Sequence, residues 1–173
     1  MGFSLVELLI TIALFAIILT FSIPGFTALK LRNDRATAVN ELTSHLNFAR
    51  YTALQQGEEI IVCPSADASQ CMPGRSWMSG WITWANRDRD TPPVRDEDEP
   101  LLRVAGTISA ALSINANRNY FEFRPSGSAI NGTWVICHSP DQIPVLAVIL
   151  SITGRLRLSA TMADGSTLTC TPN

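Results

Sequence analysis

The sequence predicts an α+β protein in which one long N-terminal helix packs on a mostly antiparallel β domain. Two features predict the helix: an apolar run at the N-terminus and, directly after it, apolar residues that recur at helical spacing. A third feature predicts the sheet, because beyond residue 57 the chain consists of short runs of β-branched and aromatic residues separated by turn residues. The 173 residues are enough for one such domain with its own core.

The first part of the helix, residues 3–25, has the length of a membrane span. The apolar run that begins at Phe3 and ends at Ile23 is 21 residues long, and Glu7 is its only charged residue. At about 1.5 Å per residue this run reaches roughly 30 Å, one hydrocarbon thickness. The run is longer than the apolar region of a signal peptide, and "SIPGF" is a poor signal-peptidase site. We therefore expect a retained transmembrane helix.

The second part, residues 26–57, is amphipathic. Pro24 and Gly25 should bend the helix between the two parts, because proline removes one backbone hydrogen bond. Gly57 is suited to end it as a C-cap. An apolar stripe at 3-4-3-4 spacing marks the buried face: Val39, Leu42, Leu46, Ala49 and Ala53.

Residues 58–173 form the predicted β domain. The expected strands are 59–63, 80–85, 101–105, 112–115, 120–124, 133–138, 145–151, 155–159 and 167–170. Residues 86–100 hold six acids, three arginines and three prolines, and we expect a surface loop there. Trp81 and Trp84 would face opposite sides of one strand, so one should be in the core and the other partly exposed, with Trp77 nearby.

The four cysteines are an even number in a domain that follows a membrane anchor, which favours disulfides in an oxidising compartment. Three pairings are possible. The local pairing joins Cys63 to Cys71 and Cys137 to Cys170.

The N-terminus, "GFSLVE" followed by an apolar run, resembles the class III signal of type IV pilins and type II secretion pseudopilins. The resemblance implies cleavage by prepilin peptidase between Gly2 and Phe3, N-methylation of Phe3, and a helix-breaking proline at Pro24. It also explains Glu7: a lone carboxylate in lipid costs roughly 2.5–3.5 kcal/mol. In the assembled filament the N-terminal amine of a neighbouring subunit would pair with it, so Glu7 would act in assembly.

The leader before this cleavage point is only Met1 and Gly2, and the first basic residues, from Lys30 onward, lie on the far side of the helix. The positive-inside rule alone would orient such a chain wrongly. We therefore expect that the natural start lies upstream or that the chain was trimmed.

Later motifs resemble the GspH/FimT/FimU group of minor pilins and pseudopilins: "ARYTALQQG" 49–57, "VCPSADASQC" 62–71, "WMSGWITWANRDRD" 77–90, "CHSP" and "GRLR". The resemblance implies a subunit of the bacterial inner membrane, with a single span and a periplasmic C-terminal domain, that enters a filament. Its partners would be other pilins or pseudopilins, prepilin peptidase and the inner-membrane assembly platform. The function implied is a tip or priming subunit of a type IV pilus, with a type II secretion pseudopilin as the alternative.

"GRLR", residues 154–157, resembles the GRxR element of FimT-type minor pilins that bind DNA during natural transformation. Arg155 and Arg157 would share one face of a strand and could hold two phosphates. DNA is therefore an alternative partner, although the same arginines would also suit a solvated strand face or the acids of a neighbouring subunit.

No catalytic, cofactor or metal motif is present. The histidines, His45 and His138, belong to no recognisable triad, and the acidic loop lacks the ligand spacing of a calcium loop. We expect no enzyme, no cofactor and no metal site.

Overall fold

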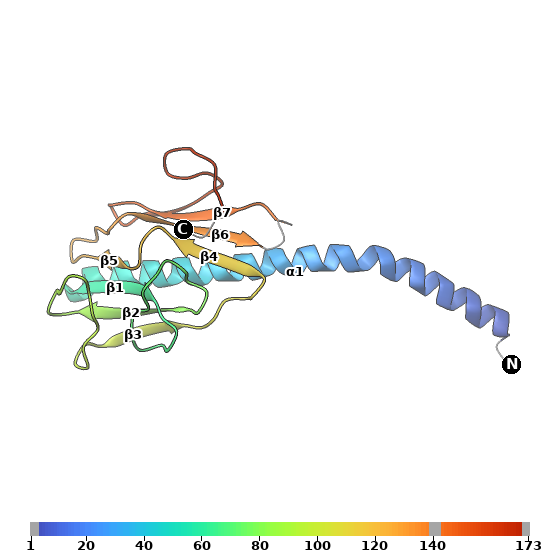
Figure 1. The fold of residues 1–173 in the computed structure, drawn as a ribbon, viewed down its shortest axis with the longest axis horizontal. Coiled ribbons are helices and arrows are strands. Elements are labelled where there is room, and N and C mark those ends of the chain that lie inside the picture. The colour runs from blue at the N-terminus through green and yellow to red at the C-terminus, as the bar shows by residue number, and fades with distance from the viewer. Residues whose placement is uncertain (1–3, 139–142, 171–173) are drawn as a thin grey trace.

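The computed structural model describes residues 4–138 and 143–170, with the side chains of residues 16 and 19–25 outside the description. One helix, α1 (Leu5–Gln56), is followed by eight strands in two sheets. The predicted α+β class is confirmed. Figure 1 shows the C-terminal half of α1 lying against both sheets while its N-terminal half extends away from them.

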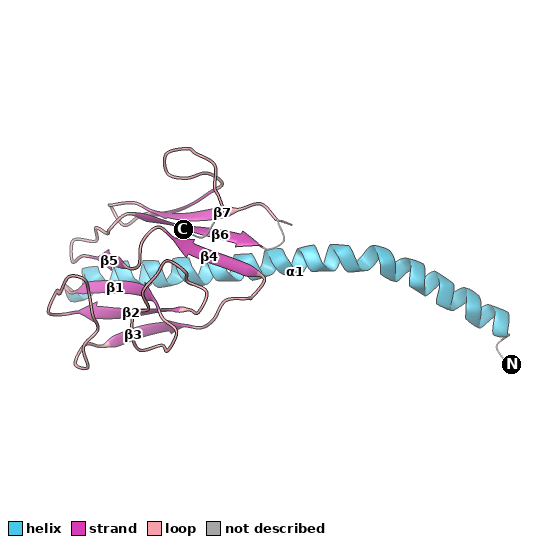
Figure 2. Cartoon of the chain, viewed as in Figure 1, coloured by secondary structure: helices cyan, strands magenta, loops and turns pink. Residues whose placement is uncertain are grey.

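Helix α1 continues through Pro24 without interruption and curves along its N-terminal half (Figure 2). It ends at Gly57, which takes the left-handed conformation at φ 68° and donates its N–H to the carbonyl of Ala53. Only glycine adopts this conformation without cost, so the predicted C-cap is confirmed.

The first sheet has the order β3-β2-β1-β5, and all its pairs are antiparallel. Its strands are β1 (Glu59–Pro64), β2 (Trp81–Asn86), β3 (Leu101–Ala105) and β5 (Phe121–Phe123). The second sheet has the order β4-β6-β7-β8 and is also antiparallel. Its strands are β4 (Leu112–Ala116), β6 (Gly132–His138), β7 (Leu146–Leu150) and β8 (Leu156–Ser159).

One core joins the helix to both sheets. The predicted apolar stripe of α1 is buried throughout and packs on the inner faces of the sheets. Four large aromatic rings fill the space between the layers: Trp77, Trp81, Phe121 and Trp134. The sheets thus cover only the half of α1 that carries this stripe.

Trp84 corrects one expectation. It faces away from α1, as the alternation with Trp81 predicts, yet both rings are fully buried. The segment closed by the Cys63–Cys71 disulfide and the ring of Tyr120 pack on this outer face, so it forms a second small core.

The expected strand 167–170 is wrong. The described residues of this segment form only one isolated bridge, between Thr161 and Thr167. The sheet already ends at β8, and the Cys137–Cys170 disulfide holds the segment 160–170 to β6 instead. Ala147 and Ile149 of β7 face outward with Val135 and Thr133, yet both are buried, which places this segment over them.

The acidic loop is a surface loop, but its Glu99 side chain is buried. Glu99 is only 3% exposed, and its carboxylate accepts the backbone N–H groups of Arg87 and Asp96. This side chain holds the two ends of the loop together.

Candidate functional site

The free half of α1 exposes a long run of large apolar side chains. Its large apolar side chains are each more than half exposed: Leu5, Val6, Leu8, Leu9, Ile10, Ile12, Leu14, Phe15, Ile17, Ile18, Phe26 and Leu29. They surround the helix rather than forming a stripe. Such a surface is stable only in lipid or against other apolar helices.

Glu7 is the only charged residue between Ser4 and Leu29. It lies in the first turn of α1, exposed, and its backbone N–H donates to the carbonyl of Ser4. In the part of the chain that the structure describes, no cationic side chain pairs with it. A carboxylate at this end of an apolar helix is free to meet a cation from outside the subunit.

The residues predicted for cleavage, methylation and helix bending lie wholly or partly outside the residues that the structure describes. Gly2 and Phe3 are not among the described residues, and for Pro24 only the helical backbone is. Within the described residues, no helix has both the length and the apolar character of a membrane span.

Arg155 and Arg157 lie at the free edge of the second sheet. Arg157 pairs with Ile149 of β7, and Arg155 immediately precedes β8. Both are exposed, and because side chains alternate along a strand they project from the same outer face. Neither guanidinium bonds or pairs with a described residue. Two free arginines therefore stand two residues apart on an edge strand.

Gly154 positions this strand. Its φ is 73°, and a Cβ placed on it would lie 2.4 Å from the carbonyl oxygen of Gly127 and 2.6 Å from Nε of Arg50. Arg50 of α1 donates from Nε to that same carbonyl at 3.1 Å. The glycine of "GRLR" thus lets the turn before β8 close onto the helix.

Both disulfides of the local pairing are present. Cys63 and Cys71 join across 8 residues with their Cα atoms 5.5 Å apart, and Cys137 and Cys170 join across 33 residues at 5.8 Å. Each fixes a strand-less segment to the outer face of one sheet.

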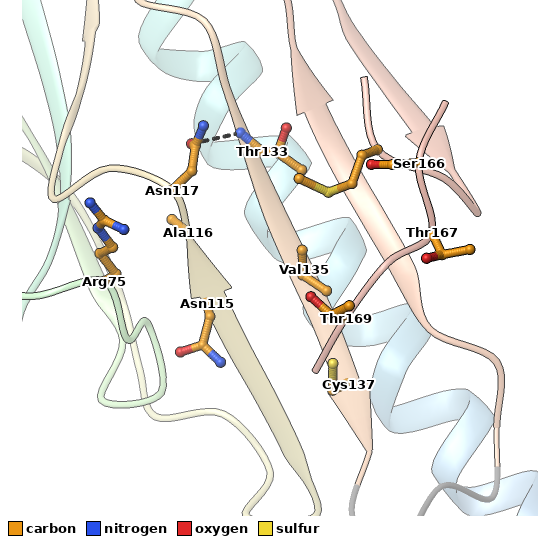
Figure 3. Close-up of a pocket in the computed structure, with 11 residues that line it drawn as sticks. Arg75, Asn115, Ala116, Asn117, Thr133, Val135, Cys137, Ser166, Thr167 and Thr169 are labelled. Atoms are coloured by element: carbon orange, nitrogen blue, oxygen red, sulfur yellow. Dashed lines mark hydrogen bonds between the residues drawn. The ribbon is translucent and has the colours of Figure 1, made fainter. Parts of the chain in front are cut away.

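A polar groove lies on the outer face of the second sheet (Figure 3). It has a volume of about 360 Å³, and β4 and β6 form its floor. In Figure 3 Arg75 lies on one side, and Ser166, Thr167 and Thr169 of the disulfide-held segment lie on the other. Sequence reasoning missed this groove, because its lining comes from segments between residues 75 and 169 that share no motif.

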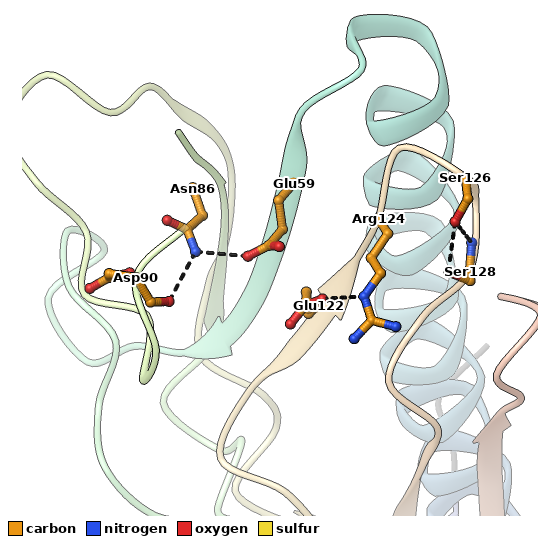
Figure 4. A network of polar contacts seen from close by, with 7 residues as sticks. All are labelled: Glu59, Asn86, Asp90, Glu122, Arg124, Ser126 and Ser128. Carbon is orange, nitrogen blue, oxygen red and sulfur yellow. Dashed lines mark hydrogen bonds and ion pairs between the residues drawn. The ribbon is translucent and has the colours of Figure 1, made fainter. Parts of the chain in front are cut away.

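A polar network lies at the end of the first sheet (Figure 4). Asn86 donates from Nδ2 to Glu59 at 2.8 Å, and Arg124 donates from Nε to Glu122 at 2.7 Å. Burial, and then the neighbouring Glu122 carboxylate, raises the pKa of Glu59. Within the described residues no three His, Cys, Asp or Glu side chains gather as metal ligands do. This network is structural, since its polar groups satisfy one another.

His45 is buried beneath β2. Its Nδ1 lies 3.3 Å from the Thr83 hydroxyl, and its ring meets Trp81 edge-on. Burial, followed by the charge of Arg103, lowers the pKa of His45 to about 4. A neutral, packed imidazole in this position supports the core and faces no groove.

Comparison with known proteins adds a family and a fold. The model of the family described as type II transport protein GspH matches residues 38–154. No curated protein matches the chain.

Three solved structures share the fold. The type IV minor pilin FimU of Pseudomonas aeruginosa aligns with a TM-score of 0.56 and 20% identity over 74% of this chain and 90% of FimU. A second crystal form of FimU gives 0.53 and 19% over 72% and 91%. The minor pseudopilin EpsH from the type 2 secretion system of Vibrio cholerae gives 0.50 and 14% over 72% and 94%.

Proposed function

Since the chain belongs to the GspH family of minor pilins and pseudopilins, we propose that it is a minor pilin of the tip or priming complex of a type IV pilus. One observation carries the proposal: the C-terminal half of α1 packs under the sheets, whereas the described side chains of the N-terminal half are exposed and mostly apolar, with Glu7 as their single carboxylate. In a subunit of this shape the apolar half of α1 lies in lipid before assembly and packs among the same helices of neighbouring subunits afterwards.

Glu7 would drive the transfer between these two environments. In lipid its charge costs roughly 2.5–3.5 kcal/mol, and pairing with a neighbour's N-terminal amine offsets that cost only inside the filament. This requires cleavage after Gly2, which creates a free amine on Phe3 for N-methylation. The site of action is then the inner membrane, with the β domain in the periplasm, and afterwards the filament. Other pilins, prepilin peptidase and the inner-membrane assembly platform are the partners.

The proposal is tested by complementing a deletion strain with wild type, Glu7→Ala or Thr11→Ala. Thr11 lies one turn further along α1 and its hydroxyl donates to the Leu8 carbonyl of the same helix, so it is the matched control. We expect Glu7→Ala to reach the membrane but to enter sheared pili at least tenfold less, with Thr11→Ala unchanged. Intact pili with lost exoprotein export on deletion would identify a secretion pseudopilin instead, and equal assembly of Glu7→Ala and wild type would refute the role of Glu7.

A second candidate function, DNA capture, is favoured by the two free arginines at β8. Full-length protein in non-ionic detergent would be titrated with duplex DNA at two salt concentrations, beside Arg155→Ala/Arg157→Ala. Because the arginine-to-alanine variant loses two phosphate contacts, its plot of log K against log salt should be less steep, with a slope smaller in magnitude by about 2. Arg75→Gln/Arg118→Gln removes the same charge elsewhere and should leave binding unchanged. If both double variants bind DNA like wild type, β8 has another role.

A further inference from the structure

The polar groove of the second sheet extends beyond the segment shown in Figure 3. A second hollow of about 240 Å³ shares Arg75 and Asn117 with it and reaches Arg118 and Tyr120. The groove thus follows the outer face of the sheet from the Cys137–Cys170 disulfide to the end of β4. Neither α1 nor the arginines at β8 line either hollow.

The groove is basic and rich in donors. No carboxylate lines either hollow, whereas Arg75 and Arg118 are both exposed. Arg118 is held by a bond from Nε to the Asn131 carbonyl, and the Arg75 guanidinium bonds to no described residue. Asn117 accepts the Thr133 N–H on its Oδ1 at 3.0 Å, which leaves its two amide N–H donors for a ligand. The groove therefore suits an anion that also accepts hydrogen bonds.

The lining is fixed before any ligand arrives. Ala116 donates its N–H to the Arg75 carbonyl at 2.8 Å, which ties the loop bearing Arg75 to β4. The disulfide holds the opposite wall to β6. A groove whose two walls are both anchored loses little entropy on binding.

The wall formed by segment 160–170 indicates the class of ligand. Among the described residues, no hydrogen bond involves the backbone of Leu168 or Thr169, and Thr169 lines the groove. Backbone N–H and C=O groups without a partner are free to pair with the backbone of another chain. Tyr120 packs on the small core around Trp84, so its ring is not free to stack on a sugar or a base.

From these observations we propose that the groove binds an extended acidic peptide segment of a partner protein. The peptide backbone pairs with Leu168 and Thr169, and its carboxylates meet Arg75 and Arg118.

The test uses a fluorescent ten-residue peptide of alternating Asp and Thr, blocked at both ends, and full-length protein in non-ionic detergent. Binding is measured by anisotropy. We expect the Asn-for-Asp peptide to bind at least tenfold more weakly. An N-methylated acidic peptide, which keeps the charge but lacks backbone donors, should also lose at least tenfold. Arg75→Gln/Arg118→Gln should lose at least tenfold, while Arg155→Gln/Arg157→Gln keeps wild-type affinity.

Three results would overturn the proposal. The first is no binding of the acidic peptide to folded wild type. The second is an equal loss in both double variants, which would mean non-specific charge attraction. The third is tight binding of single-stranded DNA or an acidic polysaccharide that Arg75→Gln/Arg118→Gln abolishes and that the peptide fails to displace. Near-ultraviolet circular dichroism confirms that each variant is folded, and the two control peptides test the site on unaltered protein.

Discussion

Replacing Gly154 by alanine should destabilise the protein by about 2–5 kcal/mol. The left-handed backbone, with φ 73°, costs an alanine about 1–2 kcal/mol. The added methyl would also lie 2.4 Å from the Gly127 carbonyl oxygen, and overpacking of this kind costs about 1–3 kcal/mol. The clash is with backbone, so it can be relieved only by moving the turn or by breaking the bond that Arg50 makes to the same carbonyl.

Gly165 is the matched control. It has φ 87°, but no atom lies within 4 Å of a Cβ placed on it, so Gly165→Ala should cost only the backbone share, about 1–2 kcal/mol. Urea unfolding of oxidised protein in non-ionic detergent, followed by the fluorescence of the buried tryptophans, measures both variants. If Gly154→Ala is no less stable than Gly165→Ala, the close approach of this turn to α1 is wrong.

The remaining predictions concern the disulfides and His45. Replacing both cysteines of a disulfide by serine should lower the free energy of unfolding in urea by an amount set by the chain entropy of the closed loop. We expect about 4 kcal/mol for Cys137–Cys170 and about 3 kcal/mol for Cys63–Cys71, whose loop is shorter. The reverse order would contradict the loop argument. The pKa of His45 is about 4 in the folded protein, below its unfolded value of 6.5. The neutral imidazole therefore contributes fully to the free energy of unfolding above pH 6.5. This contribution is lost as the pH falls toward 4, by at most about 3 kcal/mol. His45→Gln keeps a partner for Thr83 and should show a correspondingly flatter pH dependence, whereas parallel curves would show that His45 does not titrate this way.

Several features of the fold were predictable because they depend on neighbours in the sequence. The helix followed from its 3-4-3-4 stripe and its end from Gly57, since both are local backbone and spacing effects. Every one of the eight observed strands begins within one residue of an expected start, because alternation and turn residues mark them.

Other features could not be predicted because they depend on what packs on top of an element. Trp84 lies on the predicted face of its strand, opposite Trp81, but its burial depends on the segment closed by the Cys63–Cys71 disulfide. Residues 167–170 alternate like a strand, yet the sheet ends at β8 and the disulfide to Cys137 decides their position.

The sequence by itself determined the long half-apolar helix, its lone carboxylate at Glu7, the β domain and the two arginines on one strand face. Period and composition encode these features, because each arises from residues within a few positions of one another. Only the tertiary structure decided that Gly154 closes onto Arg50 and that Arg75, Asn117 and Thr169 border one groove. These residues come together through strand pairing and a disulfide across long separations, and such contacts leave no periodic signal in the chain.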